Sequence, residues 1–155
     1  ISQGAQPLVS FQYGREDHAA CRKLLRYGLT TVSVLAPVLF ALIFLFAPQI
    51  VRTYLSHASS ELVEYSIHAF RRYSISYLLV GFNIVIGGFL TALERPLPAI
   101  SISVGRGLVL QSAVLLLFAA VFGGEALWYT PILSEAMCLV LSLVFLRSYR
   151  REHSV

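Results

Sequence analysis

The sequence predicts an all-α integral membrane protein, built as a bundle of several bilayer-spanning helices. Of its 155 residues, 57% are hydrophobic and 13% are charged, whereas about 25% of the residues in a typical soluble domain are charged. Residues 27–51 contain no charged side chain. As a helix that stretch reaches about 37 Å, enough to cross a hydrocarbon core of roughly 30 Å. A single segment in lipid must satisfy its own backbone hydrogen bonds, which requires a helix.

The first part of the chain predicts the end of one transmembrane helix, a loop and a complete span. Residues 1–14 resemble the last turns of a span, because polar side chains recur at helical spacing on one face: Gln3, Gln6, Ser10 and Tyr13. Residues 15–26 indicate a basic loop, which could itself be helical, and residues 27–52 indicate the transmembrane helix that follows it.

The rest of the chain predicts three more transmembrane helices, at residues 73–93, 99–122 and 127–146. A polar segment at 53–72 precedes them, and Ser59 or Ser60 in it can cap a helix that runs on into the next span. A short break at 94–98 and a turn at Gly123–Gly124 separate the last three spans. Residues 147–155 predict a basic tail.

The placement of Arg and Lys predicts the orientation of these segments. The loop 15–26, the turn 94–98 and the tail 147–155 fall on one side if the segments alternate across the membrane. The positive-inside rule makes that side the cytoplasm, so we expect the C-terminus there and the segment 53–72 outside. Arg71 and Arg72 count against this orientation.

Glu135 is the candidate ion-coupling residue. It lies about eight residues, or roughly 12 Å, inside the last predicted span. A carboxyl group there costs a few kcal/mol, so it should face the bundle interior, together with Cys138 and Ser142 on the same helical face. It could be a carboxylate that binds a proton or cation. It could equally be a structural acid, neutral or paired, that fixes helix packing.

Four further polar residues inside the spans have two readings each. Arg106, between Gly105 and Gly107, could snorkel or form a structural ion pair, or it could pair with an acid of the transport pathway. Asn83 and Gln111 could line a substrate cavity or hold helices together. Tyr77 could stack on a cationic substrate, although packing or lipid contacts would equally explain it.

Other classes of function lack their motifs. Cys21 and Cys138 are too few and too far apart in the sequence for a metal site, and the histidines have no ligand spacing. The sequence has no phosphate-binding loop and no Ser/His/Asp set, and it shows no continuous basic face for nucleic acid. We therefore expect no enzyme, no metal and no nucleic-acid partner.

The stretch GAQPLVSFQYGR at residues 4–15 resembles the G-x-Q-P-[IL]-[IV]-[SG]-[YF]-x-[YF]-G-[AR] signature of multidrug and toxic compound extrusion (MATE) transporters. The order of later features is also similar to that family: Asn83 upstream of LTALE at 90–94, then Arg106, then LWYTPILSE at 127–135. The resemblance covers nearly the whole chain.

That resemblance implies a fold of twelve spans in two six-helix lobes around a central cleft. This chain would supply the end of helix 8 and helices 9–12 of the C-terminal lobe, and the N-terminal lobe of the same protein would be missing. Some members carry an Asp in helix 10 for the coupling cation, but the span 73–93 has no acid. The coupling site would then lie in the missing lobe or rest on Glu135.

The implied function is a proton- or sodium-coupled antiporter of the inner (plasma) membrane, a xenobiotic exporter. Its expected partners are lipophilic cationic small molecules and membrane lipids, with the coupling ion in place of a cofactor. One alternative is a lipid-linked oligosaccharide flippase, which needs a strongly cationic cavity where this chain offers only Arg106. The other is a membrane scaffold that transports nothing.

Overall fold

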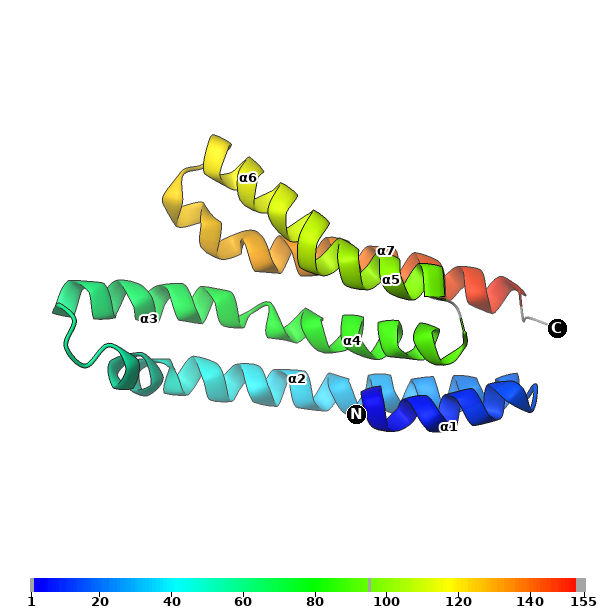
Figure 1. The fold of residues 1–155 in the computed structure, drawn as a ribbon. Helices are drawn as coiled ribbons and strands as arrows, with labels where there is room; N and C mark the ends of the chain where they lie inside the picture. The colour runs from blue at the N-terminus through cyan, green and yellow to red at the C-terminus, as the bar shows by residue number, and fades with distance from the viewer. Residues whose placement is uncertain (1, 95, 153–155) are drawn as a thin grey trace.

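The computed structural model describes residues 2–94 and 96–152, and it shows helices joined by short turns (Figure 1). The elements are, in order, α1 (Ser2–Gly14), α2 (His18–Tyr54), α3 (Ser60–Ser74), α4 (Tyr77–Ala92), α5 (Pro96–Val104), the π-helical η1 (Gly105–Leu110), α6 (Gln111–Val121), the 3₁₀-helical η2 (Gly124–Tyr129) and α7 (Thr130–Glu152). No β-strand occurs in the described part, which confirms the all-α prediction.

Within the described residues, four helical stretches are long and apolar enough to cross a membrane: His18–Tyr54, Ser60–Ala92, Leu97–Val121 and Ala126–Tyr149. They overlap the four complete spans predicted from the sequence. The shorter α1 corresponds to the helix end expected at 1–14. The chain is therefore an integral membrane bundle.

Within the segment 15–26, residues Arg15–Asp17 form the connection and residues 18–26 are helical, which is the alternative that the sequence left open. The Asp17 carboxylate accepts a hydrogen bond from the Ala20 N–H at 2.8 Å and caps α2, which then begins at His18. The basic residues that suggested a loop form the exposed first turns of this long helix, which continues through Pro37 and Pro48.

The polar segment predicted at 53–72 is mostly α3. Ser59 caps this helix, because its hydroxyl accepts from the Leu62 N–H at 3.4 Å, which confirms one of the two predicted caps. Between α3 and α4 the hydroxyls of Ser74 and Ser76 donate to main-chain carbonyls three residues earlier, at 2.7 and 2.8 Å. A short break separates the two helices there, within one apolar stretch, Ser60–Ala92.

The last two spans contain the two segments that are not regular α-helix, η1 and η2. The span predicted at 99–122 is interrupted by η1, whose wider π-helical turn coincides with Gly105-Arg106-Gly107. The 3₁₀ segment η2 docks on α3, where the Trp128 indole N–H donates to the Tyr65 hydroxyl at 2.8 Å. Helix α7 extends the span predicted at 127–146 into the predicted tail, and residues 153–155 lie outside the described part.

Helix α4 lies at the centre of the bundle. In Figure 1, α3 and α4 run between one layer made of α1 and α2 and another made of α5, α6 and α7. Glycines allow close contact with α2: a Cβ added to Gly81 would lie 2.7 Å from Val32 Cγ1, and one added to Gly28 would lie 3.1 Å from Val85 Cγ1. Small residues at a helix contact let dispersion forces act where lipid removes the hydrophobic driving force.

Candidate functional site

A buried polar cluster joins α4 to α7. The Asn83 side chain is 1% exposed, and its Nδ2 donates to Glu135 Oε2 at 2.7 Å and to the Glu135 main-chain oxygen at 3.0 Å. The Ser142 hydroxyl, also buried, donates to Asn83 Oδ1 at 3.2 Å. Both ends of the amide are therefore used, and Asn83 fixes the position of the Glu135 carboxylate.

Arg106 approaches Glu135 from η1. Its Nη1 lies 3.7 Å from Glu135 Oε1, and the two side chains are 32% and 12% exposed. The arginine offsets part of the desolvation cost of the acid in the bundle. The structure thus brings together three of the predicted site residues, Asn83, Arg106 and Glu135, from three elements.

Gln111 lies apart from this cluster, at the start of α6. Its Oε1 accepts from the Ser134 hydroxyl at 2.6 Å, and the same hydroxyl lies 3.1 Å from the Pro131 carbonyl oxygen. The contact joins α6 to α7, one residue before Glu135. Its predicted contact with a substrate stays a prediction, and the structure gives Gln111 a packing partner.

Tyr77 lies at the start of α4, half-buried, with its ring centroid 5.9 Å from that of Tyr73 in an edge-to-face arrangement. The structure does not bring it to the cluster of Asn83, Arg106 and Glu135. Its predicted stacking on a cationic substrate is untested.

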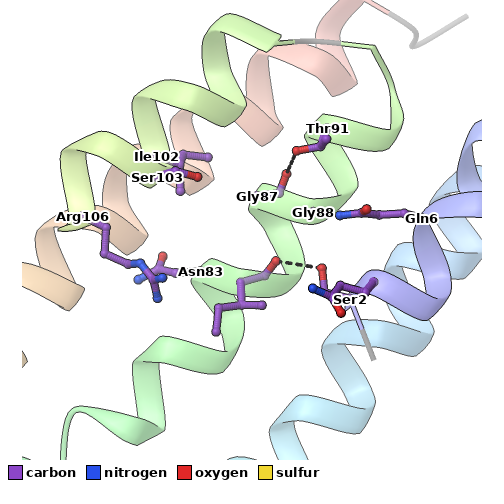
Figure 2. A pocket seen from close by; sticks show the side chains of 11 residues that line it. Ser2, Gln6, Asn83, Gly87, Gly88, Thr91, Ile102, Ser103 and Arg106 are labelled. Carbon is purple, nitrogen blue, oxygen red and sulfur yellow. Dashed lines mark hydrogen bonds between the residues drawn. The ribbon is translucent and has the colours of Figure 1, made fainter. Parts of the chain in front are cut away.

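A cavity of about 430 Å³ opens beside the cluster, among α1, α4, α5 and η1 (Figure 2). Its size is in the range of small-molecule sites. The residues that line it are Ser2, Gln3, Gln6, Asn83, Ile84, Gly87, Gly88, Thr91, Ile102, Ser103 and Arg106. The polar face predicted for α1 therefore meets a polar stripe of α4, and neither Gln111 nor Tyr77 contributes to this lining.

The charge distribution of this cavity is asymmetric. Among the described lining residues, Arg106 alone carries a charge, and Figure 2 shows its guanidinium reaching toward Asn83. Opposite lie neutral groups, of which the Ser2 hydroxyl donates to the Ile84 carbonyl at 3.1 Å. Glu135 stands outside the lining and touches the cavity through Asn83 and Arg106.

The sequence interpretation did not single out Ser134 or Ser2 as site residues. Ser134 is 1% exposed and Ser2 lines the cavity. A signal for Ser134 was available, since it neighbours Glu135 on a helix whose buried face also carries Cys138 and Ser142. Both cysteine thiols are buried, with Sγ 3.7 Å from the Val9 carbonyl oxygen for Cys21 and 3.8 Å from the Ile102 carbonyl oxygen for Cys138.

Comparison with known proteins gives one family. A family model described as MatE matches residues 1–117, from α1 into α6. No curated protein and no solved structure matches the chain. Asn83, Arg106 and Gln111 lie inside the matched range, whereas Glu135 lies beyond it.

Proposed function

This chain belongs to the MatE family, whose members are membrane transporters. We propose that it functions as part of a cation-coupled antiporter. A proton or a sodium ion moves down its gradient while a lipophilic cation, such as a drug, leaves the cell by alternating access. We place the protein in the inner membrane with its C-terminus in the cytoplasm, on the basic-residue count. The proposal needs no cofactor besides the coupling ion and no enzymatic step.

The observation that carries the proposal is the contact chain from Glu135 through Asn83 and Arg106 to the cavity. With Glu135 ionised, the ion pair holds Arg106 and leaves the cavity nearly neutral, so a cation can enter. With Glu135 protonated, the positive charge of Arg106 is no longer compensated, and it repels a cationic ligand. Proton and cargo then exclude each other, which is the negative coupling that an exchanger requires.

A sodium ion would act at the same place by another route. The Asn83 Oδ1 and the Glu135 carboxylate present oxygen ligands inside the bundle. Transporters of several folds bind coupling ions at such midplane sites. Binding of sodium would neutralise Glu135 and release Arg106 just as protonation does.

The test is efflux of a lipophilic cationic dye from proteoliposomes that contain the full-length protein, driven by an imposed pH or sodium gradient. We expect Glu135→Gln to reduce gradient-driven efflux by about tenfold or more while the protein still folds, because glutamine preserves an oxygen for Asn83 but cannot ionise. Glu61→Gln, an exposed carboxylate outside the cluster, is the matched control.

A Glu135→Gln variant with wild-type gradient-driven efflux would refute the coupling role. If dye efflux and drug resistance survive deletion of the whole protein, the transport proposal fails and the result favours the scaffold alternative.

The flippase alternative requires a strongly cationic cavity, and Arg106 is the one charged side chain among the described lining residues. A diphosphate would bind Arg106 when Glu135 is protonated, so acidification would strengthen its binding, whereas it would weaken the binding of a cationic dye. Measuring both ligands at two pH values in the purified protein separates the two functions. Dye binding that strengthens with acidification would contradict the antiport proposal.

A further inference from the structure

A second cavity, of about 630 Å³, lies between the C-terminal end of α2 and α3. It is far along the chain from the cluster around Glu135 and shares no lining residue with the first cavity. Its polar lining consists of Arg52, His68, Arg71, Ser56, Ser60 and Glu64. Among the described lining residues, two arginines and a histidine accompany one carboxylate, so the cavity fits an anion.

Arg71 is held in place by a feature of α2. Pro48 has no N–H, so the carbonyl of Phe44, four residues earlier, lacks its helical donor. Arg71 Nε donates to that carbonyl oxygen at 3.3 Å, and its guanidinium carbon lies 4.9 Å from the centroid of the Phe44 ring. The contact fixes the guanidinium in the cavity wall.

Arg52 and His68 are exposed, and within the described residues neither has a hydrogen bond or an ion pair. Their donors are therefore available to a ligand. Guanidinium groups bind phosphate in a bidentate way, and hydroxyls such as those of Ser56 and Ser60 add neutral donors.

The position of the cavity selects the source of the anion. Arg52 lies near the end of the candidate span His18–Tyr54, which places the basic residues at the level of lipid headgroups. Leu45 lies on the same face of α2, one turn before Pro48 and two turns before Arg52, and it is 65% exposed. A headgroup in the cavity would therefore continue into acyl chains along an apolar helix surface, which a free phosphate ion cannot use.

We propose that this cavity binds the phosphate of an anionic phospholipid. Arg52, His68 and Arg71 contact the headgroup, and the acyl chains lie along the exposed apolar face of α2. The site does not depend on the transport mechanism proposed above. Glu64, the one acid among the described lining residues, opposes the ligand and limits its affinity.

The test uses the purified full-length protein in a neutral detergent, titrated with phosphatidylglycerol and with phosphatidylcholine, with bound lipid counted by native mass spectrometry. We expect a preference for phosphatidylglycerol that Arg52→Gln combined with His68→Gln weakens by about fivefold or more, since one arginine near a lipid surface contributes about fivefold. The matched control is Arg22→Gln combined with Arg147→Gln, which removes exposed basic side chains elsewhere and should leave the preference unchanged.

Glu64→Gln should change the affinity for phosphatidylglycerol in the opposite direction. Removing the acid should tighten phosphatidylglycerol binding by about fivefold. A misfolded protein cannot produce such a gain. Equal binding of the two lipids, or a preference that survives the double substitution, would overturn the proposal. Millimolar inorganic phosphate that fully displaces the lipid would show an anion site without lipid specificity, which also overturns it.

Discussion

The spans that contain α4 and α7 differ from α2 and from the α5–α6 span in burial, although all four are apolar enough to cross a membrane. Within the most apolar window of each, 39% and 33% of the residues are buried in the spans of α4 and α7, against 11% and 6% in α2 and the α5–α6 span. Apolar composition therefore brings a helix into the membrane but does not decide which helix is central.

The polar side chains of α2, α4 and α7 account for part of this difference. In α2 the hydroxyls of Thr30, Thr31 and Ser33 each donate to the carbonyl four residues earlier, at 2.8 to 2.9 Å. These groups are satisfied within their own helix and can face lipid. Asn83 in α4 and Glu135 in α7 have no such local partner, and each needs the other helix. A polar group that cannot be satisfied within its own helix therefore ties that helix to a neighbour, here α4 to α7.

The largest test of this contrast is Asn83→Leu. It removes three hydrogen bonds at the α4–α7 contact, so we expect the free energy of unfolding to fall by about 3 kcal/mol, at about 1 kcal/mol for each bond. Thermal or denaturant unfolding in detergent measures the loss. Thr30→Val, which removes a hydroxyl bonded within its own helix, should change it by less than about 0.5 kcal/mol. Equal effects of the two substitutions would break the comparison.

A buried leucine of α4 and an exposed leucine of α2 provide a second test of the contrast between these helices. Leu90 of α4 is fully buried at 0% exposure, whereas Leu39 of α2 is 50% exposed. We expect Leu90→Ala to cost about 2–3 kcal/mol, because it leaves a cavity between helices. Leu39→Ala should cost less than about 0.5 kcal/mol, since detergent or lipid replaces the lost contacts. The same unfolding assay measures both changes. A large loss in the free energy of unfolding for Leu39→Ala would mean that protein covers that face of α2.

The smallest expected effect tests the contact between α2 and α4. A Cβ at position 81 would lie 2.7 Å from Val32 Cγ1, so Gly81→Ala should lower the free energy of unfolding by about 1–2 kcal/mol through overpacking. Val32→Ala in the same protein should restore most of the loss, because it removes the opposing methyl groups. Gly4→Ala is the control, with no atom within 4 Å of the added methyl. Failure of the second substitution to rescue would argue against this close contact.

Much of the architecture was predictable from short-range rules. Long apolar stretches, the Ser59 cap and the polar faces of α1 and α4 follow from helical periodicity and from the cost of polar groups in lipid. The family resemblance read from residues 4–15 and the features after them agrees with the MatE match over residues 1–117. The sequence left open whether residues 15–26 are loop or helix, and the structure shows that the capping carboxylate of Asp17 starts the helix there.

The sequence by itself determined that this chain enters a membrane as helices and that Glu135 and Asn83 turn away from lipid, because hydration lost in the bilayer must be replaced inside the protein. Only the tertiary structure decided which groups replace it. It paired Asn83 with Glu135, set Arg106 beside them at the edge of a cavity, and gave Gln111 to Ser134 instead. Periodicity fixes the face of a helix that carries a side chain, but the partner depends on how the helices pack across the bundle.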